Sequence, residues 1–251
     1  MPMLQIDLNA DLGEVSIEHD ARLLPYLSSA NIACGVHAGN PHDIADLMQR
    51  CQQHGVAIGA HPSYWDHQHF GRQELNNPPE HIYQLMRYQL GAMQALAHAQ
   101  SVTLNHVKPH GALYNRSAID EHAAEAVAQA VFDTDRNLIL VGLANSPSIS
   151  RAKTLGLQTV SEGFADRRYT DAGLLTPRSQ ANAMIENTEE AIEQVLAMIQ
   201  QQQIKTLSGQ VISLAVQSIC LHGDGPHALD FAKALHHTLQ QHQIQICASL
   251  S

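Results

Sequence analysis

Long hydrophobic runs are missing from this sequence of 251 residues. No stretch approaches the roughly 20 apolar residues that a helix needs to cross a bilayer, so we expect no membrane-spanning segment and no membrane partner. The first residues have neither a basic start nor an apolar segment typical of a secretion signal. We therefore expect a cytoplasmic protein.

Positive charge and cysteine are also scarce. Lys and Arg together number 14 against 24 Asp and Glu, which gives a formal net charge of -10. Binding a nucleic acid needs clustered cations that neutralise its phosphates, so we expect no nucleic-acid partner. The four cysteines are scattered without a C-x-x-C pair, and we interpret them as buried thiols of a cytosolic protein.

Several signatures of enzyme classes are absent as well. The chain has no Walker-type phosphate loop and no G-x-G-x-x-G turn between a strand and a helix. It also has no G-x-S-x-G elbow and no cysteine in a catalytic context. Hydride transfer and serine-hydrolase chemistry are therefore poor interpretations of this sequence.

The chain does have a regular alternation of strand and helix patterns. Short apolar runs suit buried strands, and amphipathic patterns follow them with cap signals such as Asn40 before Pro41. Asn77, Pro78 and Glu80 predict another helix start, with Asn77 as the cap. The seven predicted strands cover residues 4–9, 30–34, 56–60, 103–109, 137–142, 157–161 and 218–221.

Seven strand–helix units in succession predict a parallel sheet of the α/β class. Polar groups follow six of the seven strands around a ring, whereas an open doubly wound sheet would concentrate them at one switch point. We therefore predict a single (β/α) barrel domain over residues 1–251 with about seven parallel strands. Residues 205–213 predict a hairpin, and residues 244–248 predict a closing strand.

Residues 103–115 organise the predicted site. The strand in this stretch ends at Pro109, and Gly111 permits a sharp turn after it. Alternation places Lys108 at the C-terminal mouth of the strand, where α/β proteins bind ligands, and His110 follows directly. A surface lysine and a turn histidine are the plainer interpretation of either residue alone. The recurrence of polar residues after other strands favours a site.

Polar residues from these strand ends should meet at one rim of the barrel. Taken singly, each has a structural explanation, such as a helix cap or a satisfied histidine. Together, carboxylates, imidazoles and one amine supply what acid–base chemistry needs: a proton acceptor, a proton donor and a cation for an oxyanion. The predicted rim consists of Asp7, Asn9, Asp11, His37, His61, Lys108, His110, Glu162 and His222.

Whether this rim holds a metal stays open at the level of sequence. The residues of suitable ligand type for zinc or a neighbouring divalent ion are Asp11, His37, His61 and His222. No H-x-H, H-E-x-x-H or C-x-x-C spacing supports a metal, and each candidate comes from a separate strand. The sequence therefore offers candidates and no committed metal site.

The loop after the sixth strand indicates an anionic substrate. Arg167 and Arg168 lie there beside a strand end, and guanidinium groups bind carboxylates in a bidentate way. An ion pair between Asp166 and one of these arginines, which would only hold the loop, is the alternative. Arg72 and Arg178 are weaker candidates of the same kind.

Six motifs in order resemble the LamB/YcsF (lactam-utilisation) family, collinearly over nearly the whole chain. They are DLNADLGE (7–14), SANIACGVHAG (29–39), GAHPSY (59–64), HVKPHGALYN (106–115), EGFADRRY (162–169) and CLHGD (220–224). The resemblance implies a barrel related to those of polysaccharide deacetylases and glycoside hydrolases. It also implies cleavage of the lactam of 5-oxoproline (pyroglutamate) to L-glutamate with ATP hydrolysis, by a 5-oxoprolinase that includes two partner subunits, B and C.

Within that reaction the residues suggest roles that we state as hypotheses. Asp11 or Glu162 would act as general base, His61 or His110 as general acid, and Lys108 as a clamp on an oxyanion or a phosphate. The substrate-binding candidates are Asn9, His37, Arg72, Arg167, Arg168 and His222, with Arg167 or Arg168 taking the substrate carboxylate.

The chain has no recognised ATP loop, so we expect ATP, with Mg, to be handled together with the partner subunits. Two alternatives remain open at this stage. One is a self-sufficient, metal-dependent deacetylase or amidohydrolase on the same barrel. The other is a non-catalytic, lactam-binding subunit.

Overall fold

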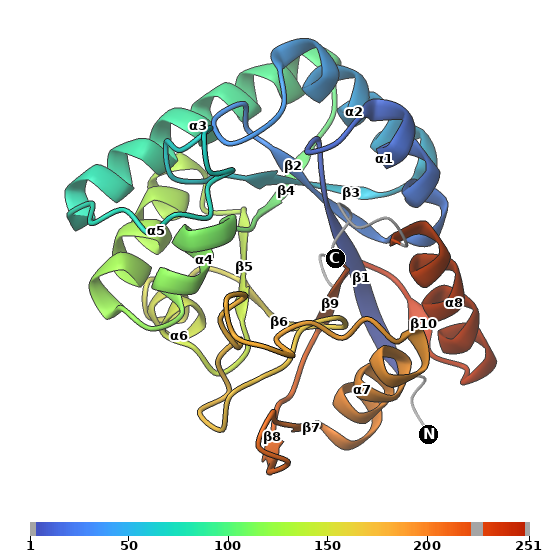
Figure 1. Ribbon diagram of the computed structural model, residues 1–251. Helices are drawn as coiled ribbons and strands as arrows, with labels where there is room; N and C mark the ends of the chain where they lie inside the picture. The colour runs from blue at the N-terminus through green and yellow to red at the C-terminus, as the bar shows by residue number, and fades with distance from the viewer. Residues whose placement is uncertain (1–3, 222–227, 249–251) are drawn as a thin grey trace.

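Seven parallel strands close into a barrel in the computed structural model, which describes residues 4–221 and 228–248 (Figure 1). The order around the ring is β1-β2-β3-β4-β5-β6-β9, and β9 pairs back with β1. The predicted barrel of about seven parallel strands is confirmed. Its strands are β1 (Gln5–Leu12), β2 (Ser29–Ala33), β3 (Ala57–His61), β4 (Leu104–Val107), β5 (Ile139–Leu143), β6 (Thr159–Phe164) and β9 (Ser218–Leu221).

Helices surround the barrel and cover its outer face (Figure 1). The longest, α3, packs against α2 and α5. Within the described part of the chain, no helix has the length and hydrophobicity to span a membrane. The helices are α1 (Ile17–Leu23), α2 (Pro41–His54), α3 (Pro79–Gln100), α4 (Gly111–Ser117), α5 (Glu121–Thr134), α6 (Pro147–Thr154), α7 (Thr188–Gln201) and α8 (Ala228–Gln241), with a 3-10 turn η1 (Leu24–Tyr26).

Helix caps follow the sequence signals at α2 but not at α3. The side chain of Asn40 accepts hydrogen bonds from the first turn of α2, and Pro41 is its first residue. The prediction of Asn77 as the cap of α3 is wrong. Pro78 stands before the helix in an extended conformation, with ψ of 158°. A residue that precedes a proline disfavours the helical conformation, so Pro79 keeps Pro78 out of the helix.

Several short elements differ from the sequence patterns. α4 follows β4 almost directly, where the sequence predicts only a turn, and Glu162 lies inside β6 instead of after it. The predicted hairpin at residues 205–213 is confirmed as the antiparallel pair β7 (Gln203–Lys205) and β8 (Val211–Ser213). The terminal strand β10 (Gln245–Ile246) pairs with the start of β1, so it extends the sheet and does not close the barrel.

Strand alternation gives the barrel an apolar outer face and a polar interior. On β1, Ile6 and Leu8 belong to the hydrophobic core, and the intervening Asp7, Asn9 and Asp11 make polar contacts across the barrel. Buried polar groups are costly unless they are hydrogen-bonded, so this interior must be a connected network. The neighbouring strands contribute side chains that are at most 1% exposed: Asn31, His106, Lys108, Glu162 and Ser218.

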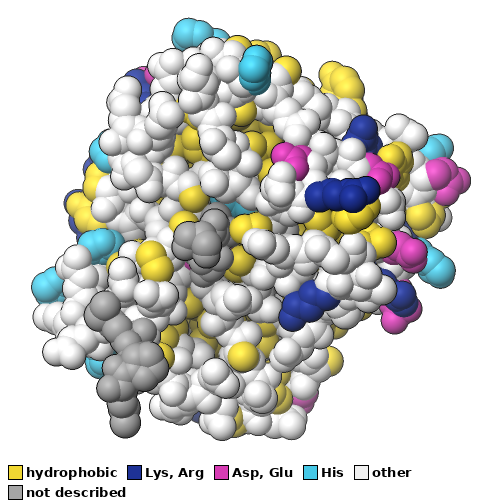
Figure 2. Space-filling model, turned by 180° about the vertical axis from the view of Figure 1, so that it is seen from behind, with side chains coloured by type: hydrophobic (Ala, Val, Ile, Leu, Met, Phe, Trp, Pro, Cys, Tyr) yellow, Lys and Arg dark blue, Asp and Glu magenta, His cyan; other side chains and the backbone are white. Residues whose placement is uncertain are grey.

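Many histidines outside the barrel interior lie on the protein surface. Exposed histidines on the helices include His54, His98 and His122. Figure 2 shows histidine side chains spread along the outline of the face opposite to Figure 1. Lys and Arg side chains on that face are few and form no continuous patch. The histidines that matter for chemistry are therefore the buried ones at the barrel rim.

Candidate active site

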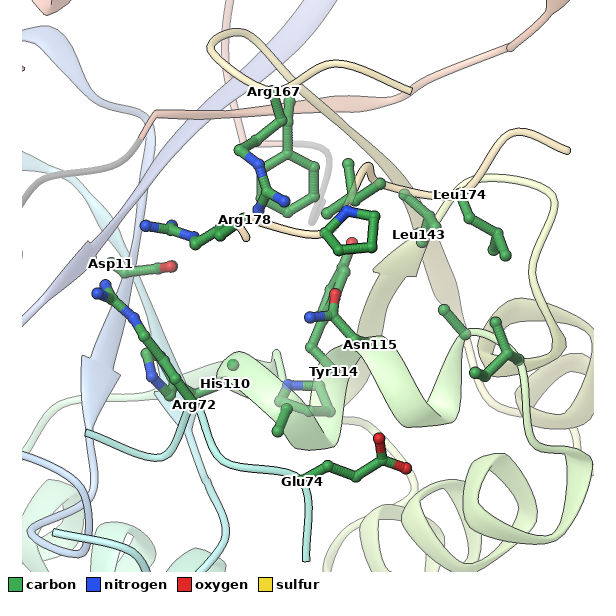
Figure 3. Close-up of a pocket in the computed structure, with 18 of the residues that line it drawn as sticks. Asp11, Arg72, Glu74, His110, Tyr114, Asn115, Leu143, Arg167, Leu174 and Arg178 are labelled. Carbon is green, nitrogen blue, oxygen red and sulfur yellow. The ribbon is translucent and has the colours of Figure 1, made fainter. Parts of the chain in front are cut away.

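A cavity of about 750 Å³ opens at the C-terminal end of the barrel strands. Such a position is where barrels of this class bind their ligands. Figure 3 shows Asp11, Arg72 and Arg178 on one side of the cavity and Leu143 and Leu174 on the other. The cavity therefore has a polar, charged wall and an apolar wall.

A buried lysine stands at the polar side. Lys108 follows β4 directly, and its Nζ lies 3.0 Å from Asp11 Oδ1 and 2.9 Å from Glu162 Oε1. The same Nζ lies 3.3 Å from Asn9 Oδ1 and 3.0 Å from Cys220 Sγ. We call these five residues the lysine cluster. Four strands of the barrel contribute to it, so it exists only in the closed fold.

Two asparagines hold the lysine cluster in place. Asn9 Nδ2 donates to Glu162 Oε1 (2.9 Å) and to Ser218 Oγ (2.7 Å). Asn31 Nδ2 donates to Asn9 Oδ1 (2.7 Å) and to Asp11 Oδ1 (2.9 Å). The β1–β2 register pairs Asp11 with Asn31, which explains their contact. Both carboxylates are therefore oriented by neutral amide donors as well as by the ammonium.

The ammonium remains charged inside the protein. Burial works to lower the pKa of Lys108, but the negative charges of Asp11 and Glu162 outweigh it and raise the pKa well above its ordinary value. Tyr114 Oη donates to the second oxygen of Glu162 at 2.7 Å, and burial raises the pKa of Tyr114 well above its usual range. Every charged group of the lysine cluster thus has partners of the opposite kind.

A second group of polar side chains lies beside the first, on the far side of Asp11. Glu14 Oε1 is 2.9 Å from His37 Nε2 and 3.1 Å from His110 Nδ1. His110 Nδ1 is in turn 2.9 Å from His61 Nε2, which lies 3.3 Å from Asp11 Oδ2. The ring of His37 stacks on that of His110 with centroids 3.9 Å apart. We call Glu14, His37, His61 and His110 the histidine cluster.

Burial and neighbouring charges shift the pKa values of these buried groups in opposite directions. Burial lowers the pKa of His37 to about 4 and that of His106 to about 3, so both are neutral near pH 7. Burial also acts to lower the pKa of His61, but the Asp11 carboxylate beside it raises the pKa above its usual value. Burial acts to raise the pKa of Glu14, whereas hydrogen bonds with His110 and His37 lower it.

Two glycines make room for this arrangement. A Cβ on Gly59 would lie 2.1 Å from the His106 ring, so only glycine fits beside that buried imidazole. Gly111 has φ of 54°, and a Cβ there would meet the Gly71 carbonyl oxygen at 2.5 Å. Gly111 therefore allows the loop between β3 and α3 to pack, at Gly71, against the start of α4.

The neighbouring candidates Arg167 and Arg168 point to different parts of the surface. Arg167 is buried, lines the cavity and donates from Nη2 to the Thr176 carbonyl oxygen at 2.6 Å. Burial lowers the pKa of Arg167 to about 10, with a further contribution from Arg178. Arg168 points elsewhere: it forms an ion pair with Glu190 at 2.7 Å and lines a different surface hollow. Only the first of the two neighbours can reach a ligand in the cavity.

The structure brings most of the predicted site residues together. Around the cavity or directly beneath it lie Asn9, Asp11, His37, His61, Arg72, Lys108, His110, Glu162 and Arg167. Arg168 is not among them. Asp7 lies deeper in the barrel, where Ser28, Ser29 and Ser218 donate to its carboxylate, and burial raises its pKa. Asp7 is therefore wrongly placed at the rim. His222 lies outside the described residues.

The predicted rim lacks three residues that contribute to the site. Glu14 is the centre of the histidine cluster, Asn31 orients Asp11, and Tyr114 binds Glu162. Gly13, with φ of 78°, turns the chain after β1 so that Glu14 reaches back over the barrel mouth. The sequence signal for Glu14 is an acidic residue shortly after a strand-ending glycine.

Some of these side chains could hold a metal ion. Ligand atoms of Asp11, His61 and His110 lie within 4.8 Å of one another, as do those of Glu14, His37 and His110. Imidazole and carboxylate are ligands that suit zinc and its neighbours. Of the four metal candidates from the sequence, the structure retains Asp11, His37 and His61 in these groups.

A parallel (β/α) barrel with buried acid, amine and imidazole groups at its C-terminal mouth defines a class that includes many enzymes. Comparison with known proteins identifies the family within this class. The chain is 46% identical over 247 residues to the A subunit of 5-oxoprolinase from Staphylococcus carnosus (strain TM300), a match that covers 97% of this chain and 98% of the relative. The crystal structure of a lactam utilization protein from Thermus thermophilus superposes with a TM-score of 0.91 at 38% identity, over 98% of this chain and 100% of that one.

The LamB/YcsF family profile matches residues 6–251, and the chain belongs to this family. A peptidoglycan deacetylase of Bacillus subtilis has a TM-score of 0.50 at 9% identity over 98% of this chain and 88% of that one. At that identity the likeness shows a shared fold alone. The expected relation to deacetylase barrels is thus confirmed at the level of fold.

Proposed function

We propose that this chain is the A subunit of a 5-oxoprolinase and takes part in cleaving the lactam of 5-oxoproline to L-glutamate. The Staphylococcus carnosus relative bears that name over its whole length, and the Thermus thermophilus structure is described as a lactam utilization protein. The observation in the structure that carries the proposal is Lys108. Lys108 lines the cavity and Asp11 and Glu162 hold its ammonium, which suits a group that binds the oxygen of an amide.

The geometry refines the roles of the two carboxylates. Glu162 is fully buried, does not line the cavity, and accepts from Lys108, Asn9 and Tyr114. We assign it the task of positioning Lys108. Asp11 lines the cavity and its side chain is 11% exposed, so it is the better candidate for the base that activates water. His110 lines the same cavity and would return the proton to the leaving nitrogen.

A five-membered lactam is an unstrained amide, so its hydrolysis needs activation. We propose that the lactam oxygen attacks the γ-phosphorus of ATP, with ADP as the leaving group. Water then adds to the activated carbon and the C–N bond breaks as the nitrogen takes up a proton, which leaves an acyl phosphate. A second water hydrolyses this acyl phosphate to the carboxylate of glutamate and inorganic phosphate. The cations that line the cavity, Lys108, Arg72, Arg167 and Arg178, would stabilise the phosphorylated intermediate and the substrate carboxylate. ATP and its Mg ion would be bound together with subunits B and C.

Reconstitution tests this proposal. The chain is mixed with its B and C partners, 5-oxoproline and ATP, and glutamate and ADP are followed with each component omitted in turn. We expect both products only in the complete mixture. Lys108→Met should lower kcat about 10²-fold or more. The matched control is Lys153→Met, an exposed residue of α6 that should leave kcat unchanged.

Two results would contradict these roles. Full turnover by the Lys108→Met complex would exclude the clamp. A rise in KM with unchanged kcat would show that the chain only binds the lactam, with all chemistry in the partners.

A further inference from the structure

The histidine cluster has a feature that the proposed reaction does not explain: its ligand atoms face one another. His110 Nδ1 lies 2.9 Å from His61 Nε2 and 3.1 Å from Glu14 Oε1. His61 Nε2 also lies 3.7 Å from Glu14 Oε1 and 3.3 Å from Asp11 Oδ2. The ligand atoms of Glu14, His61 and His110 therefore lie close together, and Asp11 adjoins them through His61.

The backbone fixes which ring nitrogens carry hydrogen. His61 Nδ1 is 2.7 Å from the Lys108 carbonyl oxygen, and His110 Nε2 is 2.9 Å from the Phe70 carbonyl oxygen. A carbonyl oxygen can only accept, so each of these nitrogens carries the hydrogen and donates it. When both imidazoles are neutral, the other nitrogens, His61 Nε2 and His110 Nδ1, are lone pairs that point at each other. Two such acceptors at 2.9 Å attract only when one ring takes up a proton or when a metal ion takes the place of that proton.

The charges around these ligand atoms lead to the same conclusion. The carboxylates of Asp11, Glu14 and Glu162 carry three formal negative charges, and Lys108 supplies one positive charge. A proton on His61 balances one of the two remaining negative charges, and a metal ion that replaces this proton leaves both to be balanced. A divalent cation would balance them.

We propose that Asp11, Glu14, His61 and His110 bind one divalent first-row transition-metal ion, with zinc as the reference. A tetrahedral zinc site with bonds of about 2.1 Å places its ligand atoms about 3.4 Å apart. Four of the six separations among these atoms are 2.9, 3.1, 3.3 and 3.7 Å, on either side of that value, and the ligand atoms of Asp11 and His110 lie within 4.8 Å of each other. Of the sequence candidates, Asp11 and His61 are kept, Glu14 and His110 are added, and His37 lies behind Glu14, whereas His222 lies outside the described residues.

Groups behind the ligands orient them in the manner of known metal sites. Each ligating imidazole donates its other N–H to a backbone carbonyl, and His37 donates to Glu14 at 2.9 Å. The second oxygen of Asp11 accepts from Lys108 and Asn31. His37 is therefore a positioning residue for the carboxylate of Glu14.

The catalytic meaning of the ion rests on the proposed function, whereas its binding does not. When bound, the ion would lower the pKa of a water ligand and polarise a carbonyl oxygen. Asp11 and His110 would then act as ligands instead of exchanging protons directly with the substrate. Binding can be measured on the chain alone, without substrate, nucleotide or partner subunits, so a failed reconstitution would leave this measurement unaffected.

Calorimetric titration of the chelator-treated chain with Zn²⁺ tests the inference, with metal content measured by mass spectrometry after dialysis. We expect one tightly bound ion per chain and an increase in Tm on loading. His110→Ala and, separately, Asp11→Asn should weaken binding roughly 100-fold or more, and His37→Gln about 10-fold. Circular dichroism verifies that each variant is folded.

The 17 histidines of the chain call for a matched control, because surface imidazoles bind zinc weakly. His98→Ala removes an exposed histidine of α3 and should leave the tight site unchanged. The inference is overturned if the wild-type chain shows no saturable binding. It is equally overturned if folded His110→Ala retains the ion as well as wild type does.

Discussion

The lysine cluster and the histidine cluster lie side by side at the same barrel mouth, yet they differ in how their polar atoms are matched. In the lysine cluster an ammonium, two amides and a phenol donate to two carboxylates, so donors meet acceptors. In the histidine cluster, two imidazole nitrogens face each other and a carboxylate. In the first group each acceptor has a donor, whereas in the second we propose that a metal ion takes the place of the missing donors.

Asp11 belongs to both groups. Its Oδ1 binds Lys108 and Asn31, and its Oδ2 faces His61. The difference between the clusters teaches that a preorganised site need not contain, within the protein, a donor for every acceptor. In our proposal, the fold holds Lys108 in place as the oxyanion clamp, and the neighbouring position takes a bound cation.

The largest expected effect comes from the residue that the two clusters share. Asp11→Asn keeps the shape of the side chain but removes its charge. The variant therefore lacks the proposed base or metal ligand, and its contact with Lys108 is weaker. We expect kcat of the reconstituted complex to fall by about 10²- to 10⁴-fold. Asp46→Asn, on the exposed side of α2, serves as the control. A loss below tenfold would separate Asp11 from the chemistry.

The same substitution in each cluster should have different effects on stability. Glu162→Gln removes a charge that pairs with buried Lys108, and we expect a loss of about 3 kcal/mol in the free energy of unfolding. Glu14→Gln in the metal-free chain brings an N–H donor to the bare nitrogens, so we expect a change within about 1 kcal/mol. Urea unfolding of the metal-free proteins measures both. Equal losses would show that the two clusters are not differently matched.

The neighbouring arginines extend the comparison to substrate binding. Arg167→Lys replaces a bidentate group at the cavity, and we expect KM for 5-oxoproline to rise about 10-fold. Arg168→Lys changes the partner of Glu190 outside the cavity and should change KM less than about twofold. The reverse pattern would place the substrate carboxylate at the other hollow.

A further prediction concerns the support of the turn that carries Glu14. Asp20 Oδ2 accepts from Gly13 N at 2.7 Å, and burial raises the pKa of Asp20 from 3.8 to about 6. A carboxyl whose pKa is raised on folding loses stabilisation as pH rises between those values. Asp20→Asn should therefore become more stable relative to wild type, by about 2 kcal/mol, between pH 4 and pH 7. A pH-independent difference in thermal unfolding would contradict this.

Sequence patterns predict the barrel because its signals are local. Alternation on β1 places Asn9 and Asp11 on one face, and Asn40 with Pro41 marks the start of α2. The start of α3 could not be located from Asn77, because two consecutive prolines delay the helix. Local signals thus indicate the element order more reliably than the element ends.

The site is less completely predictable because its geometry is set by loops. Residues at strand ends, such as Lys108 and His61, can be assigned to the rim from strand alternation alone. Glu14 depends on a tight turn at Gly13, and the choice between Arg167 and Arg168 depends on the direction of each side chain from an irregular loop. No sequence period encodes such directions.

Anomalous X-ray scattering at the zinc edge, from crystals of the zinc-loaded chain, tests most directly whether a cation belongs between the two imidazoles. We predict one strong peak within about 2.1 Å of both His61 Nε2 and His110 Nδ1. Peaks confined to surface histidines such as His98, with none between these two nitrogens, would contradict the assignment.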